Sequence, residues 1–90
     1  MKIKFLLETK DGIVGEFHYE WGCPFIPHIG EGVHIENIFD EGKFILCDDD
    51  NITSKVDDFE YYITSHSWNV KAVTWCKHEE YFVLMSLFGE

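Results

Sequence analysis

Positive charge is scarce in this sequence. Its 90 residues include seven lysines and no arginine against 17 aspartates and glutamates, which gives a net charge of −10. A protein that binds the phosphate backbone of nucleic acids gains affinity by neutralising phosphates with basic side chains. Cations that are so few and form no cluster cannot supply this, and an anionic membrane surface would repel the chain as well. We therefore expect neither a nucleic acid nor a membrane among its partners.

Cysteine is also sparse, and long apolar runs are missing. Cys23, Cys47 and Cys76 are odd in number and include no CxxC spacing, whereas a secreted disulfide scaffold has a denser, even set. The apolar run near the N-terminus is too short for the hydrophobic part of a signal peptide. No segment approaches the ~18 apolar residues that cross a bilayer. These features predict a cytoplasmic protein.

Motifs that mark common catalytic sites are missing too. The sequence contains no GxSxG, no phosphate-binding glycine loop and no HExxH. General acid–base catalysis needs one buried carboxyl with a raised pKa, but the run of three aspartates at 48–50 is typical of a solvated loop. A nucleophilic Cys23 would need a cation or a helix N-terminus to lower its pKa, and the excess of acids opposes this. We expect no enzymatic activity.

The chain nevertheless has the material for a stable core. Apolar residues make up 46% of it and aromatic residues 17%. A chain of this length can bury enough apolar surface to fold without metal or disulfide bonds. No internal repeat or low-complexity linker interrupts it, so we expect a single domain over residues 1–90 and no cofactor.

Most of the negative charge lies in the middle third of the chain. Ten of the 17 carboxylates lie between Glu31 and Glu60, opposed only by Lys43 and Lys55, so this third carries −8 of the total. Such a surface attracts a basic partner over a long range, and salt weakens the attraction. We expect a non-enzymatic interaction module, either an inhibitor or immunity-type protein that binds a basic partner or a housekeeping module that is merely soluble. The expected contact surface consists of Asp48, Asp49, Asp50, Asp57, Asp58 and Glu60.

The alternative function is calcium binding in the same acidic segment. A twelve-residue EF-hand frame that starts at position 49 provides suitable oxygen ligands at its usual positions. However, Ser54 stands where the sharp turn of this loop requires glycine, and the flanking sequences do not predict two long helices. A solvated loop in which Ser54 caps a turn is therefore favoured, and no metal is expected. The calcium ligands, if any, would be Asp49, Asn51, Thr53, Asp57 and Glu60.

A zinc site is a further candidate that the spacing disfavours. Two thiolates and two imidazoles form a common tetrahedral ligand set. The four candidate ligands are Cys23, His28, Cys76 and His78. Neither C-x4-H nor C-x-H is a usual ligand pair of a structural zinc finger, and cysteine is often buried simply as a small apolar residue.

The first part of the chain predicts a β-hairpin. Apolar and polar residues alternate over residues 3–7 and again over residues 13–21, with the period of a half-buried strand. In the second run we expect Ile13 on the apolar face and Val14 on the polar one. Between the two runs, Asp11-Gly12 supplies the positive φ of a tight turn.

The later strands are shorter or less regular. Short strands are expected at residues 33–35 and 43–47. The apolar residues of the strand at 68–75 change parity midway, which indicates either burial on both faces or a β-bulge. Residues 81–88 are apolar on both faces, which predicts a central strand. Residues 54–66 fit a helix or a strand, and we expect a helical turn near Ser54–Asp58 followed by a strand.

Large aromatic residues suggest a groove for a peptide or ligand. The candidates are Phe17, Tyr19, Trp21, Trp68 and Trp75. Most large aromatic side chains in a domain of this size belong to the core, however, because they bury much apolar area. A structural role in the core is therefore favoured over a binding groove for these aromatic residues.

Two motifs carry a resemblance to a known type of fold. They are P-x-x-G-x-x-V in Pro27–Ile35 and W-x-V-x-x-V-x-W at residues 68–75, and a final apolar strand follows them. With these motifs the chain resembles small bacterial β-proteins without an assigned function. The resemblance implies a small, SH3-like, partly open barrel, and no site residue carries over from it. Residues 36–67 depart from the pattern as an acidic insertion.

The predicted fold class is therefore mainly β. We expect a small SH3-like or partly open barrel, or a rolled antiparallel sheet, of about five to seven strands. The acidic insertion at about residues 36–67 would interrupt it and would contain at most one short helix.

Overall fold

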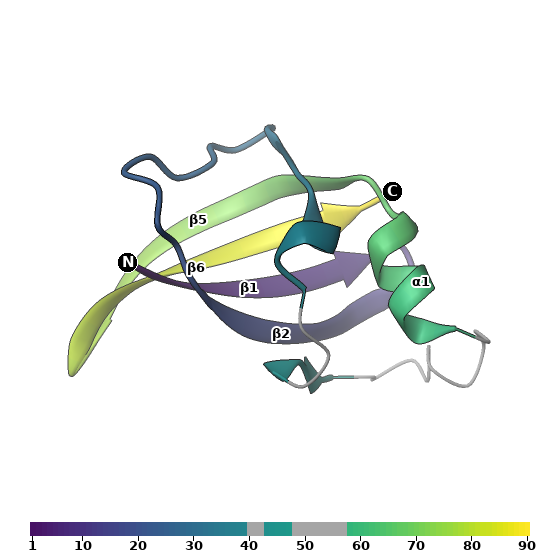
Figure 1. The fold of residues 1–90 in the computed structure, drawn as a ribbon, viewed down its shortest axis with the longest axis horizontal. Helices are drawn as coiled ribbons and strands as arrows, with labels where there is room; N and C mark the ends of the chain where they lie inside the picture. The colour runs from purple at the N-terminus through teal and green to yellow at the C-terminus, as the bar shows by residue number, and fades with distance from the viewer. Residues whose placement is uncertain (40–42, 48–57) are drawn as a thin grey trace.

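One curled, six-stranded sheet forms most of the structure (Figure 1). The structure is a computed structural model that describes residues 1–39, 43–47 and 58–90, and of residues 59 and 78 it describes only the backbone. In chain order the elements are β1 (Lys2–Thr9), β2 (Gly12–Glu20), β3 (Gly32–Val33), the 3-10 turn η1 (Ile35–Asn37), β4 (Ile45–Leu46), α1 (Phe59–Ser65), β5 (Trp68–His78) and β6 (Glu80–Gly89). The mainly β fold class is confirmed.

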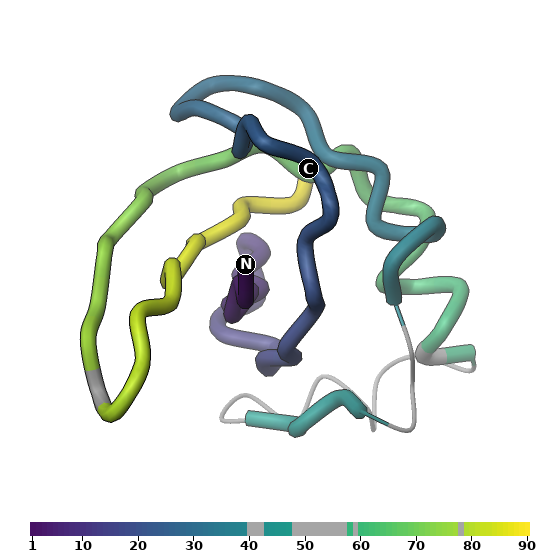
Figure 2. Tube along the Cα trace, turned by 60° about the vertical axis from the view of Figure 1, so that its left-hand side comes forward, coloured from purple at the N-terminus to yellow at the C-terminus, as the bar shows by residue number. Residues whose placement is uncertain are grey.

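The strands follow the spatial order β3-β5-β6-β1-β2-β4. All neighbouring pairs are antiparallel except β1 and β6, which run parallel at the centre of the sheet. The sheet curls strongly without closing, as Figure 2 shows, and this confirms the partly open barrel. The parallel pair departs from the purely antiparallel sheet that was one of the predicted forms. It joins strands from the two ends of the sequence, so no local pattern could indicate it.

The predicted hairpin of β1 and β2 is confirmed, with one correction. Gly12 has φ 117° in the turn, as expected there. The register shifts between Leu7 and Glu8, so Val14 is the extra residue of a β-bulge. Val14 is consequently fully buried on the core face, whereas Ile13 pairs with Glu8 on the other face. The prediction for Ile13 and Val14 was therefore wrong, because alternation was assumed to continue without a bulge.

A second bulge explains the change of parity in β5. Val70 pairs with Leu87 of β6, but the next pair joins Ala72 to Ser86, which leaves Lys71 as the extra residue. Val73 beyond the bulge thus returns to the core face. Of the two alternatives that the sequence left open, the bulge is confirmed. The central position of β6 is confirmed as well, since it lies between β5 and β1.

The core fills the concave face of the sheet. Ile35 of η1 and Ile63 of α1, both fully buried, cover this face from outside the sheet. Phe5 and Phe17 stack on neighbouring strands with ring centroids 5.2 Å apart. The buried apolar side chains of the sheet are Ile3, Phe5, Leu7, Val14, Phe17, Trp68, Val70, Val83, Met85 and Leu87.

The acidic insertion contributes a helix where we predicted a strand. Asp58 has an extended backbone, and its side chain accepts a hydrogen bond from the backbone N–H of Tyr61 at 3.1 Å, which caps α1. The Tyr62 hydroxyl donates to Asp11 Oδ2 at 3.1 Å and lies 3.0 Å from the hydroxyl of Thr9 in the β1–β2 turn region. The cap and these tertiary bonds outweigh the strand propensity of the sequence. Apart from Asp58, the turn predicted at Ser54–Asp58 lies outside the described residues.

The two short strands are shorter than predicted. In place of a strand at 33–35, β3 ends at Val33 and η1 begins at Ile35. In place of a strand at 43–47, β4 comprises Ile45 and Leu46, which pair with Glu16 and Gly15. Both elements lie at the edges of the sheet. Neither edge strand therefore covers the full length of its neighbour.

Candidate binding surfaces

The predicted acidic surface includes the start of α1. Asp58 and Glu60, its two described members, are both exposed. Asp58 caps the helix and Glu60 lies in its first turn, where the helix dipole favours negative charge. The other predicted members, Asp48, Asp49, Asp50 and Asp57, lie outside the described residues.

Several lysines are engaged elsewhere on the protein. Lys71 Nζ lies 2.8 Å from Glu8 Oε1, and Lys4 Nζ lies 3.1 Å from Glu16 Oε1. Exposed pairs of this kind contribute little to stability. They do, however, hold these cations on the outer face of the sheet. The carboxylates of α1 have no ion pair within the described part of the chain.

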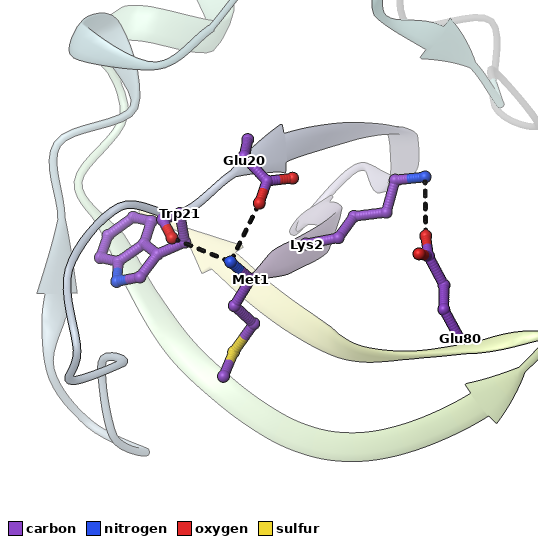
Figure 3. A network of polar contacts seen from close by, with 5 residues as sticks. All are labelled: Met1, Lys2, Glu20, Trp21 and Glu80. Carbon is purple, nitrogen blue, oxygen red and sulfur yellow. Dashed lines mark hydrogen bonds and ion pairs between the residues drawn. The ribbon is translucent and has the colours of Figure 1, made fainter.

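A polar network joins the start of β1 to β2 and β6 (Figure 3). The amino group of Met1 donates to Glu20 Oε1 at 3.0 Å and to the carbonyl oxygen of Trp21 at 3.3 Å. The backbone N–H of Trp21 donates to the Met1 carbonyl at 2.7 Å. Lys2 Nζ lies 3.8 Å from Glu80 Oε1. This network fixes the place where Trp21 leaves the sheet.

The five aromatic residues proposed for a groove do not form one. Phe17 and Trp68 belong to the core. Tyr19 and Trp21 contact each other with ring centroids 6.2 Å apart at the end of β2. Trp75 is 61% exposed and lies on β5, with β6 and β1 between it and β2. A single aromatic groove through these five residues is therefore wrong.

Sequence reasoning missed other exposed aromatic residues. Tyr81 on β6 is 69% exposed, and Lys77 Nζ lies 5.0 Å from the centre of its ring. Phe25 in the loop after β2 is exposed, and its carbonyl oxygen accepts a hydrogen bond from Trp21 Nε1 at 2.9 Å. Tyr81 has the same parity as the buried Val83, so alternation alone does not distinguish it from a core residue. It lies beyond the segments that cover the core, and no local signal could show this.

A shallow polar hollow of about 350 Å³ lies between η1 and the end of α1. It contains His34, Glu36 and His66 among its lining residues. His66 Nδ1 donates to the carbonyl oxygen of Tyr62 at 2.5 Å, which engages this ring with the helix. His34 Nδ1 lies 3.1 Å from Glu36 Oε1, and both side chains are largely exposed. The hollow thus contains an exposed histidine–carboxylate pair.

The Glu36 carboxyl has a pKa below its usual value of 4.5. The main cause is a hydrogen bond from its own backbone N–H, followed by the hydrogen bond and positive charge of His34. Because hydrogen bonds to the charged form favour ionisation, this carboxyl stays charged at pH values where a free glutamate begins to take up protons. Its contribution to stability is present above the unfolded-state pKa and is lost as the pH falls through the lowered value.

We expect His34→Ala to raise the pKa of Glu36 part of the way towards 4.5, because two of the causes that lower it are removed. The midpoint can be measured by following the Glu36 side-chain carboxyl in an NMR pH titration. His28→Ala is the matched control, since it removes the other histidine–glutamate pair, with Glu31, and should leave the Glu36 midpoint unchanged. An unchanged midpoint in His34→Ala would contradict the assignment.

The proposed metal ligands are not brought together where the structure describes them. Cys23 and His28 are exposed, and Cys76 lies on the outer face of β5. Among residues 1–39, 43–47 and 58–90, no three His, Cys, Asp or Glu side chains form a group that could hold a metal ion. Of the predicted calcium ligands, only Glu60 falls within these ranges, so the calcium site stays a prediction. Of the helices described here, none has the length and apolar character needed to cross a membrane.

The chain was also compared with known proteins. No family model, curated protein or solved structure matches it.

Proposed function

We propose that the chain is a non-enzymatic interaction module that binds a basic protein partner through its acidic middle third. The observation that carries this proposal is the start of α1, where Asp58 and Glu60 are exposed directly after the sequence's most acidic segment. The nearby Tyr62 is bonded to the β1–β2 turn region, so the fold holds this end of the helix against the sheet. Two carboxylates of the segment are therefore displayed on a fixed scaffold.

Electrostatics supports this use of the surface. Lys4 and Lys71 are paired with carboxylates of the sheet, away from α1. Within the described part of the chain, no lysine pairs with Asp58 or Glu60, so these two carboxylates are available to an external cation. An uncompensated charge patch speeds the encounter with a partner of opposite charge, and screening by salt reduces this effect.

The proposal includes an inhibitor or immunity-type role. The carboxylates would occupy the cationic site of a toxin or nuclease, and a protein of this kind should abolish the partner's activity at stoichiometric concentration. If the chain is instead a housekeeping module, capture from native lysate should yield no partner whose activity it inhibits.

Charge-neutralising variants test the surface. We expect neutralisation of the acidic segment to lower the association rate constant with a captured basic partner by about tenfold or more. The variant replaces Asp48, Asp49, Asp50, Asp57 and Asp58 by asparagine. Asparagine at position 58 still caps the helix. Partners would be captured from native lysate, and binding kinetics measured with the purified partner at low and high salt.

A variant with the same change in net charge serves as the control. It replaces Glu16, Glu20, Glu79, Glu80 and Glu90, which all lie outside the acidic middle third, by glutamine. This control should bind nearly as fast as the wild type. Equal losses in both variants would show that net charge alone acts, and an unchanged rate in the asparagine variant would refute the proposed surface. Binding that requires calcium and is lost with chelator would favour the calcium-binding alternative.

A further inference from the structure

A hollow of about 440 Å³ lies beside the first turn of α1. Tyr19 from β2, Asn37 from η1 and Glu60 from α1 contribute to its lining, and η1 and α1 lie side by side over the sheet (Figure 1). Among the described residues, β4 pairs only with Gly15 and Glu16, so no strand covers the edge of β2 next to Tyr19. The remaining lining residues are His18, Ile38, Phe39 and Lys43. The hollow thus joins three elements that are distant in the sequence, and one of them carries the proposed acidic surface.

Glu60 supplies this hollow with a carboxylate that is free to bind. It is exposed, and it forms no ion pair with any described residue. Asn37, which is exposed as well, adds a side-chain amide oxygen that can accept a hydrogen bond. The hollow therefore offers acceptors of two kinds to a ligand that carries N–H donors.

Aromatic rings form the apolar part of the lining. Tyr19 is 36% exposed, and its ring contacts that of Trp21 with centroids 6.2 Å apart. Phe39 is half-buried and packs edge-on against the core residue Phe17 at 6.0 Å. A guanidinium group stacks on aromatic faces and also donates several hydrogen bonds to a carboxylate in its own plane. Rings beside a free carboxylate suit this group better than they suit any other cation of a protein.

We propose that the hollow receives an arginine side chain of the basic partner. The inference rests on the proposed function and names the group by which the partner is held. The guanidinium would stack on Tyr19 and donate hydrogen bonds to Glu60 and to the amide oxygen of Asn37. A lysine would bring the same charge but no planar face and no fork of donors. Arginine and aromatic side chains in such pockets commonly supply most of the binding energy of an interface.

Lys43 opposes a cation in this hollow. It is exposed and contributes to the lining, but it forms no ion pair with Glu60. An arginine would therefore be repelled by a nearby charge without having to break an existing salt bridge. Removing this lysine should strengthen binding, whereas removing the acceptor or the ring should weaken it.

A short arginine peptide tests the hollow without the unidentified partner. The probe is acetyl-Gly-Arg-Gly-amide, titrated into the full chain and followed through the amide signals of the protein by NMR. Its lysine and citrulline analogues are matched probes, since citrulline keeps the shape of arginine and lacks the charge. We expect the arginine peptide to shift the signals of Tyr19, Asn37 and Glu60. The citrulline peptide should bind at least about fivefold more weakly, and the lysine peptide should lie between the two.

Variants of the lining assign the binding to this place. Glu60→Gln and Tyr19→Ala should each raise the dissociation constant of the arginine peptide by about fivefold or more, whereas Tyr19→Phe should keep it within about twofold. Lys43→Ala should lower the constant by about twofold or more, because it removes a like charge. Asp58→Asn and Tyr61→Ala are the matched controls, since both positions are exposed near or on α1 but lie outside the lining. They should leave the constant within about twofold of the wild type.

Kinetics with a captured basic partner separate this inference from the proposed function. Tyr19→Ala changes no charge, so it should leave the association rate constant within about twofold and raise the dissociation rate constant by about fivefold or more. Neutralisation of the acidic segment should instead act mainly on association. If no partner is captured, the proposed function fails, and the peptide titration alone decides whether the hollow binds arginine.

Three results would overturn the inference even if a basic partner is found. The first is an arginine peptide that binds no more tightly than its citrulline analogue. The second is an Asp58→Asn variant that weakens the peptide as much as Glu60→Gln does, which would show attraction by the acidic segment as a whole. The third is an unchanged dissociation rate of the partner from Tyr19→Ala.

Discussion

Replacing Trp68 with alanine is expected to lower the free energy of unfolding by about 3–5 kcal/mol. Trp68 is only 2% exposed and stands at the start of β5. Its Nε1 donates a buried hydrogen bond of 2.7 Å to the carbonyl oxygen of Ile63 in α1. Truncation removes a large apolar side chain from the core and also takes a donor from the last turns of the helix. A loss of this size would be a large share of the stability of a small domain.

Two further variants separate the causes of that loss. Trp68→Phe keeps much of the apolar volume but removes the bond to Ile63, so it should cost about 1–3 kcal/mol. Trp75→Ala, on the same strand but at an exposed position, should cost about 1 kcal/mol or less when measured in dilute solution. Urea unfolding followed by far-ultraviolet circular dichroism gives all three values. Equal losses at positions 68 and 75 would contradict the assignment of Trp68 to the core.

Replacing Gly89 with alanine is expected to destabilise the protein by about 1–3 kcal/mol. A glycine within a strand normally weakens it, so alanine there would usually be neutral or favourable. At position 89, however, an added Cβ would lie 2.8 Å, 2.9 Å and 3.0 Å from three ring atoms of Trp68. Trp68 pairs with Gly89 across the sheet and is held by its bond to α1, so the ring cannot move freely.

The sign of the change in the free energy of unfolding of Gly89→Ala tests this contact. Gly22→Ala is the control, because a Cβ at position 22 meets no atom within 4 Å. It should change the free energy of unfolding by no more than about 0.5 kcal/mol. Combining Gly89→Ala with Trp68→Phe should reduce the penalty at position 89, since residues in contact are not additive. A stabilising Gly89→Ala, or fully additive losses, would show that the ring does not occupy this space.

The strands that end in short turns were the most predictable part of the fold. The alternation in residues 3–7 and the Asp11-Gly12 turn act within one hairpin, so the sequence alone contains the information. The parity change in residues 68–75 likewise indicated either a bulge or burial on both faces. Local sequence patterns gave wrong predictions where the structure of a segment depends on its contacts with a second, distant segment. Val14 became a core residue through a bulge whose position depends on β1, and Tyr62 joined a helix that is held by the β1–β2 turn region.

The candidate sites were less predictable than the fold. Charge counting identified an acidic segment, but it cannot say which carboxylates are paired, since Lys71 meets Glu8 only after the sheet has formed. The aromatic residues gave no groove, because the burial of Trp68 and the exposure of Trp75 depend on what covers each end of β5. No sequence pattern indicated that part of β5 has an unpaired edge within the described chain. This edge follows from the shortness of β3, which is a property of the assembled sheet.

The parallel pairing of β1 with β6 has a consequence for the order of events during synthesis. Its register joins Ile3 to Val83 and Thr9 to Gly89, contacts that span most of the sequence. Contacts of such separation make folding slow, because the loop must close before they form. During synthesis, β1 can pair with β2 as soon as the hairpin has emerged from the ribosome. The other edge of β1 stays unpaired until β6 has been synthesised. We therefore expect chaperones to meet this protein chiefly as an unfinished sheet that lacks β6.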